Sequence, residues 1–205
     1  MSPTHHPSDE IMTAYAAGAL EPGFALVVGA HVEHCAHCAG RLRSREAASG
    51  AALQTLERAE MAPGAFNSVL NKLGDQAPAP SPAPRRPFLE RLALKPKKWV
   101  APGVWVAAVD TPHAPSNRVY LLRVAAGAPT ARHEHSGAEF CTVLSGAYRD
   151  ELGLFRAGDF AAADEGLNHQ PMIQGDEPCI CLFATEGRLK PQGLIGRVAF
   201  AVADV

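Results

Sequence analysis

The sequence lacks an excess of charge of either sign. Its 205 residues include 19 lysines and arginines against 21 aspartates and glutamates, which gives a formal net charge of −2. Proteins that bind nucleic acids usually carry a strong basic excess, so we expect no direct contact with nucleic acid. Long hydrophobic runs are missing too, since no segment reaches the ~18 uninterrupted apolar residues of a spanning helix and no apolar leader stands at the N-terminus. We therefore expect a cytoplasmic protein with no membrane partner.

Cysteine is scarce and odd in number. Five cysteines suit a disulfide framework poorly and point to a reducing compartment, where thiolates bind metals or take part in redox chemistry. Cys35 and Cys38 form a C-x-x-C pair, Cys179 and Cys181 lie two apart in an apolar stretch, and Cys141 stands alone.

A proline-rich segment divides the chain. Residues 74–87 read GDQAPAPSPAPRRP, in which the prolines remove backbone donors and favour the extended conformations of a linker. The preceding part is alanine-rich with helical patterning, and the following part has strand patterning. We predict an α + β protein of two domains, with a small zinc-bound helical bundle at 1–73, the linker at 74–87 and an all-β jelly-roll barrel at 88–205.

The expected elements follow from local patterns. Ser8 before Asp9 and Glu10 is a helix-start signature. A second helix is expected to begin near Pro22 and run toward His31, and a third to occupy residues 42–56. The expected strands cover residues 104–109, 119–124, 139–148, 179–185 and 194–202.

A fourth helix is predicted after Pro63 and Gly64. Four apolar residues fall at i, i+3, i+4 and i+7, which gives one apolar stripe: Phe66, Val69, Leu70 and Leu73. The stripe has two interpretations, packing onto the chain's own helical bundle or docking into a groove of a partner.

A metal site is predicted in the first half. His31, Cys35 and Cys38 have the spacing H-x3-C-x2-C, which on a continuous helix places them on one face. Zinc prefers a closed tetrahedron of sulfur and nitrogen in structural sites, and of the two candidates for the fourth ligand, His5 and His6, we prefer His6. The alternative is that the histidines are surface residues and the cysteines small core residues.

The small size of the expected apolar core favours the zinc interpretation. A domain of about 70 residues that is rich in alanine buries little apolar surface. A structural zinc ion adds on the order of 10 kcal/mol of apparent folding free energy. Removal of zinc is therefore expected to unfold this half.

A second metal site is predicted in the second half. In G127APTARHEHSGAEFCTVLSG146, His133 and His135 share one face of a strand, and a turn lets Glu139 return on the adjoining strand. The segment G158DFAAADEGLNH169 adds His169 after a Gly-Asp turn. The two segments resemble the paired motifs of cupins, although Asp164 stands where that pattern has proline.

The ligand set leaves the metal of the second site open. Three imidazoles and a carboxylate accept a divalent transition metal, zinc, iron, nickel, manganese or copper among them. The alternative is a barrel without metal, in which these polar groups line a small-ligand pocket. Cys141 is expected on the same side as Glu139, and the three cysteines of this half are either small buried hydrophobes or oxidisable thiols near a metal.

The whole chain resembles a known family. The stretch SDEIMTAYAAGALEPGFALVVGAHVEHCAHC followed by a cupin is similar to the ChrR family of bacterial zinc-binding anti-sigma factors, and the likeness covers nearly the whole chain. The resemblance implies that the helical domain binds a group IV extracytoplasmic-function sigma factor and keeps it from core RNA polymerase. It also implies that the cupin domain is required for release under singlet oxygen or related oxidative stress, and that the protein is not an enzyme.

Two other functions remain as alternatives. The first is a metal-dependent cupin dioxygenase acting on a thiol or a diketone, with the helical domain as an accessory, because an open coordination position on a metal activates oxygen or polarises a substrate. The second is a scaffolding protein with an empty barrel, which the amount of bound metal per chain distinguishes.

Overall fold

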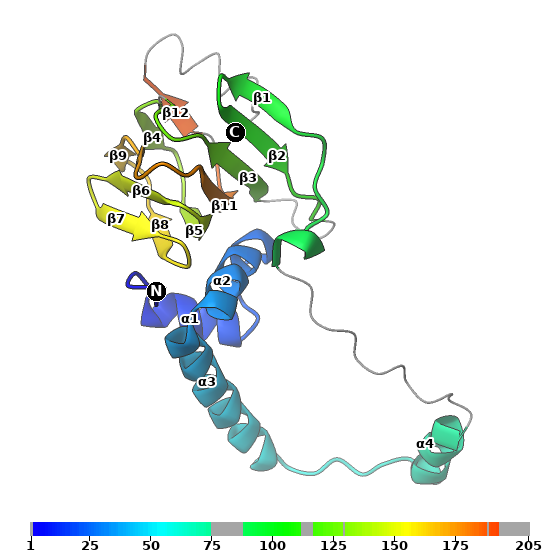
Figure 1. Cartoon of the computed structure of the whole chain (residues 1–205). Coiled ribbons are helices and arrows are strands. Elements are labelled where there is room, and N and C mark those ends of the chain that lie inside the picture. The colour runs from blue at the N-terminus through cyan, green and yellow to red at the C-terminus, as the bar shows by residue number, and fades with distance from the viewer. Residues whose placement is uncertain (1, 75–87, 112–116, 129, 188, 193–205) are drawn as a thin grey trace.

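The computed structural model describes residues 2–74, 88–111, 117–128, 130–187 and 189–192. Helices come first and strands follow, as Figure 1 shows, and this order confirms the predicted α + β class. The helices are α1 (Asp9–Ala16), α2 (Pro22–His34), α3 (Ala36–Gln54) and α4 (Ala65–Gly74), and a 3₁₀ turn, η1, covers Phe88–Arg91. No helix among the described residues is long and apolar enough to cross a membrane.

The described strands form three antiparallel sheets. The six-stranded sheet has the order β1-β2-β3-β11-β5-β8, and the two three-stranded sheets have the orders β10-β6-β7 and β12-β4-β9. The bounds are β1 (Lys98–Ala101), β2 (Val104–Ala108), β3 (Arg118–Val124), β4 (His133–His135), β5 (Glu139–Ser145), β6 (Ala147–Asp150), β7 (Gly153–Arg156), β8 (Phe160–Ala163), β9 (Asn168–His169), β10 (Met172–Ile173), β11 (Cys179–Thr185) and β12 (Leu189–Pro191).

The predicted strand over 139–148 is two strands. They separate at Gly146, which has a φ of +72°, and a Cβ added there would lie 2.5 Å from the carbonyl oxygen of Pro178. Glycine therefore serves a turn that also lies close to another backbone segment. The strand expected over 194–202 lies outside the described residues.

Local chemistry explains where the first helices begin. The Ser8 side chain accepts a hydrogen bond from the backbone N–H of Ile11 and caps α1. Pro22 opens α2 as predicted, since its fixed φ suits the first turn of a helix. The His/Cys motif does not lie on one continuous helix, because Cys35 has extended backbone (φ −117°, ψ 101°) and separates α2 from α3, which begins at Ala36 and not at the predicted residue 42.

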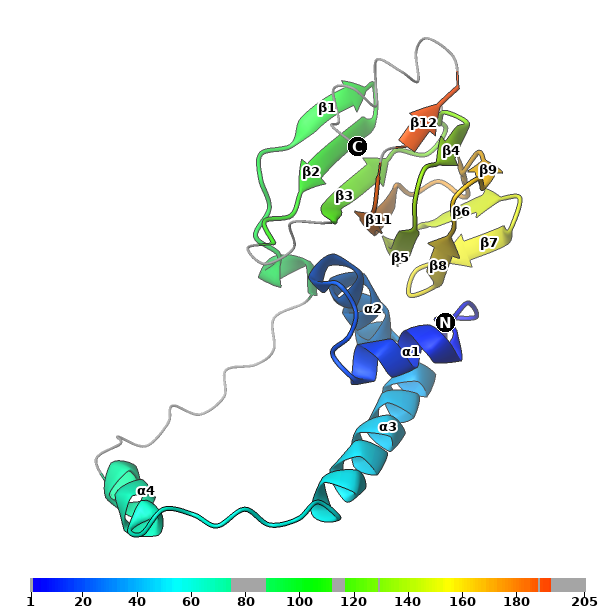
Figure 2. The same ribbon diagram turned by 180° about the vertical axis from the view of Figure 1, so that it is seen from behind.

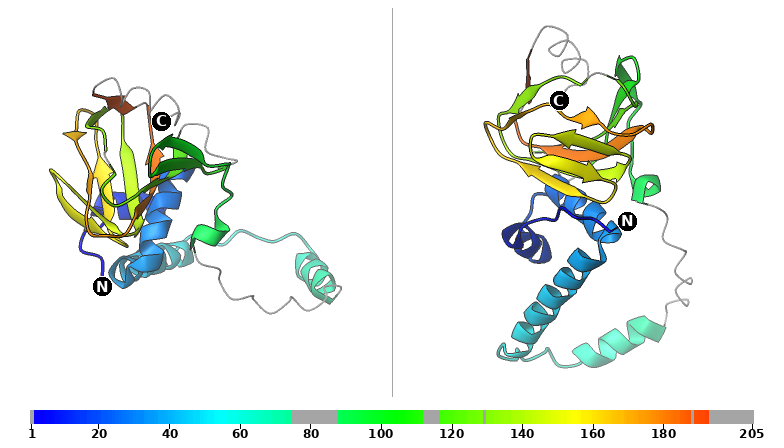
Figure 3. Two further views of the ribbon diagram at one scale, coloured as in Figure 1. Left: turned by 45° about the horizontal axis from the view of Figure 1, so that its top comes forward. Right: turned by 60° about the vertical axis from the view of Figure 1, so that its left-hand side comes forward.

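Helix α2 lies against the outer face of the six-stranded sheet, as Figure 2 and the left panel of Figure 3 show from two other sides. The Phe24 ring packs 4.4 Å from the Phe140 ring, centroid to centroid, and the Thr142 hydroxyl donates to the backbone carbonyl of Val27 over 2.9 Å. One apolar core is therefore shared by the helices and the sheet, and it includes Met12, Val27, Val28, Leu121, Leu182 and Ala184.

Helix α4 stands apart from the rest of the described chain (Figure 1). Its apolar stripe is in water, with exposed fractions of 69% for Phe66, 53% for Val69, 47% for Leu70 and 61% for Leu73. The structure therefore departs from the interpretation in which this stripe packs onto the chain's own helices. The proposed domain boundaries stay a prediction, since most of the linker lies outside the described residues.

Candidate metal centres

The four residues predicted to bind zinc come together where the first helices meet. His6 comes from the segment before α1, His31 from the last turn of α2, Cys35 from the break between helices and Cys38 from the first turn of α3. The His6 Nδ1 atom lies 3.5 Å from His31 Nε2, 3.4 Å from Cys35 Sγ and 3.5 Å from Cys38 Sγ. All four ligand atoms lie within 4.8 Å of one another, and three of the residues are buried.

These distances fit a tetrahedral ion. With zinc–sulfur bonds of ~2.3 Å and zinc–nitrogen bonds of ~2.0 Å, the nitrogen-to-sulfur edge of a tetrahedron is about 3.5 Å. His31 Nδ1 lies 2.7 Å from the carbonyl oxygen of Gly158, so Nδ1 carries the proton and the Nε2 lone pair faces the cluster. Cys35 Sγ accepts a hydrogen bond from the Cys38 N–H (3.4 Å), and Cys38 Sγ accepts one from the Arg41 guanidinium (3.8 Å), contacts of the kind that stabilise a metal-bound thiolate.

Burial sets the protonation of the metal-free cluster. It lowers the pKa of His31 to about 4, so this imidazole is neutral at pH 7. Burial, and after it the neighbouring Cys35 sulfur, raises the pKa of Cys38 to about 11. The Cys38 thiol is thus protonated until a cation arrives, and binding of zinc releases this proton.

Three other histidines near the motif, His5, His34 and His37, stay outside this cluster. His34 Nδ1 donates to the Ala30 carbonyl of its own helix over 2.8 Å. The His37 ring packs 5.1 Å from the His6 ring, and the His5 ring packs 4.3 Å from the Phe155 ring, between centroids. The structure therefore brings His6, and not these residues, to the cysteines.

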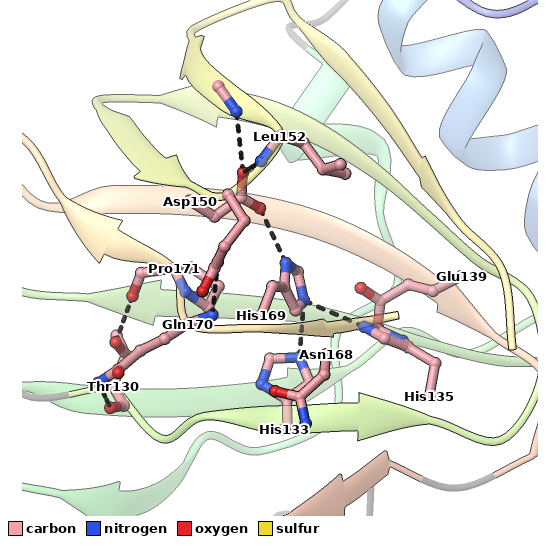
Figure 4. A network of polar contacts seen from close by, with 12 residues as sticks. Thr130, His133, His135, Glu139, Asp150, Leu152, Asn168, His169, Gln170 and Pro171 are labelled. Carbon is pink, nitrogen blue, oxygen red and sulfur yellow. Dashed lines mark hydrogen bonds and ion pairs between the residues drawn. The ribbon is translucent and has the colours of Figure 1, made fainter. Parts of the chain in front are cut away.

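The second predicted set lies inside the β-rich domain (Figure 4). His133 and His135 lie on β4, and Glu139 is the first residue of β5. His169 lies on β9, where it is paired with His133 of the neighbouring strand. All four side chains are buried, with exposed fractions of 7% or less. The Nε2 atom of His169 lies 3.0 Å from Nε2 of His133 and 3.0 Å from Nε2 of His135, and all four ligand atoms lie within 4.8 Å of one another.

The hydrogen bonds around these imidazoles fit a bound cation. His169 Nδ1 donates to the Asp150 carboxylate over 2.8 Å, and His133 Nδ1 donates to the Ala131 carbonyl over 3.0 Å. Both Nε2 atoms are therefore unprotonated, and two buried lone pairs face each other at 3.0 Å, which is repulsive without a positive charge between them. Glu139 Oε2 is buried and has no hydrogen-bond partner, so it too is available to a cation.

Burial also shifts the pKa values of this second cluster. It lowers the pKa of His133 to about 4 and that of His135 to about 3, and it raises the pKa of Glu139 to about 8. At pH 7 the metal-free site thus holds neutral imidazoles at His133 and His135 and a mostly protonated carboxyl group at Glu139. A divalent ion favours the ionised carboxylate, so binding releases a proton here as well.

The three cysteines of the β-rich domain lie in one buried cluster, and Cys141 is two residues beyond Glu139. Cys141 follows Glu139 on the same face of β5, as predicted, and is buried in one cluster with Cys179 and Cys181. The two sulfurs on β11 lie 3.6 Å apart, and all three cysteines are free thiols. Burial raises the pKa of Cys141, so this thiol is a poor nucleophile as long as the domain stays closed.

Two functional residues were missed by sequence reasoning. Asp150 orients His169, and Asp159 binds the backbone of the segment that carries His6. The position of Asp159 in the Gly-Asp turn of the second cupin motif was a sequence signal that could have singled it out. Nothing in the neighbouring sequence showed which distant segment its carboxylate binds. Asp150 precedes the β6–β7 turn and offers no comparable signal.

The fold and the two clusters define a protein that joins a helical His/Cys module to a cupin-like domain with three histidines and a glutamate. A family model described as the ChrR cupin-like domain matches residues 92–189. The anti-sigma-E factor ChrR of Cereibacter sphaeroides is 35% identical in an alignment of 199 residues that covers 93% of this chain and 93% of that one. The crystal structure of Rhodobacter sphaeroides SigE in complex with the anti-sigma ChrR matches with a TM-score of 0.75 and 35% identity, over 90% of this chain and 100% of that one. The chain belongs to the ChrR family of anti-sigma factors.

Proposed function

We propose that this protein is an anti-sigma factor that sequesters a group IV extracytoplasmic-function sigma factor. The observation that carries the proposal is the likeness along nearly the whole chain to an anti-sigma factor and to a crystal structure described as a complex with SigE. Because a sigma factor works on RNA polymerase, this activity takes place in the cytoplasm and controls transcription through a protein partner.

The N-terminal cluster supports a structural zinc site in this mechanism. An ion held by His6, His31, Cys35 and Cys38 ties the segment before α1 to α2 and α3, which gives these short helices a fixed arrangement. In the cupin-like domain, His133, His135, Glu139 and His169 would hold a divalent transition metal, zinc among the candidates, and such an ion would supply a Lewis acid.

The stripe on α4 supports a direct contact with the sigma factor. Four large apolar side chains on one helix face are 47–69% exposed, and such a face suits a hydrophobic groove of a partner. Binding to the sigma factor would bury the stripe.

Co-purification tests the proposal. We expect the chain to form a stable complex with a co-expressed group IV sigma factor, and Leu70→Asp to weaken it at least 10-fold, because a charge would enter the apolar contact. Asn71→Asp, on the opposite side of α4, is the matched control and should bind normally. Absence of a complex with the unaltered chain, or normal binding by Leu70→Asp, would contradict the α4 contact.

We further propose that oxidative stress of the singlet-oxygen type releases the sigma factor through the cupin-like domain, and that the chain is not an enzyme. The buried thiol cluster of Cys141, Cys179 and Cys181 supports the first point, since these thiols become oxidisable if the domain opens. Exposure of the complex to singlet oxygen should free the sigma factor, and His133→Ala should blunt release while leaving inhibition intact. Oxygen consumption with a thiol or a diketone, lost in His133→Ala, would favour the dioxygenase alternative instead.

A further inference from the structure

The segment that leads to His6 is bound by the cupin-like domain. Asp159, at the turn between β7 and β8, accepts hydrogen bonds on Oδ1 from the backbone N–H groups of Thr4 (2.6 Å) and His5 (3.0 Å). Its other oxygen accepts from the N–H of Arg156 over 2.8 Å. Asp159 is 1% exposed, so these charge-assisted bonds lie in a place that water hardly enters.

Further contacts fix the same segment. The carbonyl oxygen of His5 accepts from the N–H of Phe160 over 3.1 Å, and the His5 ring packs on Phe155. Together with the Asp159 bonds, these contacts hold the backbone on the residue before the His6 ligand. Little freedom is then left to the Cα of His6.

The adjoining glycine holds a second ligand of the cluster. The Gly158 carbonyl accepts from His31 Nδ1 over 2.7 Å, which orients the His31 ring and turns its Nε2 inward. Gly158 has a φ of +92°, and a Cβ added there would lie 2.8 Å from Cγ of Pro3. The turn can therefore approach the N-terminal segment closely because this residue is glycine.

We infer that Asp159 is a positioning residue for the N-terminal metal site, so that the cupin-like domain completes a site to which it contributes no ligand. Two ligands, His6 and His31, come from different segments, and one turn of the cupin-like domain aligns both. Groups that orient metal ligands typically alter metal affinity 10- to 100-fold when they are replaced. The inference rests on the proposed metal site but does not depend on a sigma factor.

An ordinary structural role for Asp159 predicts something different. If its carboxylate served the β7–β8 turn alone through the Arg156 N–H, its loss would destabilise the cupin-like domain and leave the N-terminal site unchanged. The two roles differ in which metal centre responds.

Metal release from the full-length chain distinguishes the two roles. In a His133→Ala background, which removes a ligand from the cupin cluster, we expect Asp159→Ala, which removes both acceptor oxygens, to speed zinc release to a chromogenic chelator about 10- to 100-fold. The visible spectrum of the Co²⁺-substituted chain should change as well, because the ligand geometry loosens. Asp176→Ala, at an exposed turn of the same domain, is the control and should match the parent.

A second variant removes the donor of the same hydrogen bond and keeps the Asp159 acceptor. Thr4→Pro removes the N–H that donates to Asp159 and leaves the cupin-like domain unaltered, so it should speed zinc release even if Asp159→Ala folds poorly. Parental release rates and cobalt spectra in both variants would overturn the inference. A parent chain that holds no zinc at the N-terminal cluster would instead overturn the proposed metal site, so the two failures are distinguishable.

Discussion

The carboxylate of Asp150 accepts a hydrogen bond from Nδ1 of His169 over 2.8 Å (Figure 4). Its other oxygen accepts from the N–H groups of Leu152 and Gly153 and so closes the turn between β6 and β7. One buried side chain thus shapes a turn and fixes the tautomer of a predicted metal ligand. The Nε2 lone pair of His169 is directed at the cluster because Asp150 holds the proton on the opposite nitrogen.

Asp150→Asn should therefore weaken metal binding at the cupin cluster about 10- to 100-fold. The amide oxygen can still close the turn, while the amide nitrogen is a donor and does not accept the Nδ1 proton. Metal analysis after dialysis against a weak chelator should fall from about two ions per chain to about one. Asp164→Asn, which is exposed, should keep both ions; an unchanged metal content in Asp150→Asn would contradict the assigned role.

His6→Ala should lose the N-terminal ion, whereas His37→Ala should keep it. The His37 ring lies next to the His6 ring, yet only His6 presents a nitrogen to both sulfurs within 3.5 Å. Zinc content and helical circular dichroism of the two variants, compared with Cys35→Ala, check this point. Chelation of the unaltered chain should reduce the helical signal, because the ion contributes on the order of 10 kcal/mol to the folding of this part.

The stability of the metal-free chain should depend on pH on both sides of neutrality. Folding lowers the pKa of His31 and His133 from 6.5 to about 4 and that of His135 to about 3, so the folded chain binds fewer protons than the unfolded one at these residues. Stability therefore decreases as the pH falls below the ordinary histidine pKa of 6.5. Glu139 acts in the opposite direction, because its pKa rises from 4.5 to about 8 and stability decreases as the pH rises toward that value. Thermal unfolding of chelated protein should show a maximum at about pH 7.

Glu139→Gln separates these two effects. In the chelated variant, the loss of about 1 kcal/mol between pH 7 and pH 8 should disappear, because no buried carboxyl group remains to ionise. The loss on the acidic side should persist, since the histidines are unchanged. Metal-loaded parent protein should also be insensitive between pH 7 and pH 8, and a decrease equal to that of the chelated parent would argue against metal binding by Glu139.

Gly23→Ala should destabilise the protein although it adds a good helix former to α2. The new Cβ would lie 2.8 Å from Asn117 Cβ and 2.8 Å from Val119 Cγ2, so the helix must move away from the sheet. We expect a loss of roughly 1–3 kcal/mol, as for other overpacked contacts. Gly50→Ala in α3 meets nothing within 4 Å and should instead gain about 0.5–1 kcal/mol. Denaturant unfolding of the two variants measures these changes in the free energy of unfolding and so tests how closely α2 packs on the sheet.

The grouping of the proposed metal ligands could be predicted where their spacing is local. The H-x-H pair needs nothing more than strand alternation to place both imidazoles on one face, and the H-x3-C-x2-C spacing keeps its ligands close even though the helix breaks at Cys35. That break was not predictable from periodicity, since the extended backbone at Cys35 serves a sulfur that caps α3 by accepting the N–H of Cys38.

Contacts between distant segments could not be predicted in the same way. Asp159 and Thr4 are 155 residues apart, and the hydrogen bond between them depends on how α2 lies across the sheet. The apolar stripe of α4 was found from the helical period, but a period does not tell whether a face is covered. Long-range packing decided both, and single-sequence patterns carry no information about it.

The apolar core joins α2 to β5 and β11, and this has a consequence for any cleavage of the chain. A protease that degraded the helical part would leave Phe140, Leu144 and Leu182 uncovered on the outer face of the sheet. We expect the remaining fragment to self-associate or to be degraded in turn, because a bare apolar face of this kind favours aggregation. Turnover of the helices would then remove the whole molecule and leave no intact cupin-like domain behind.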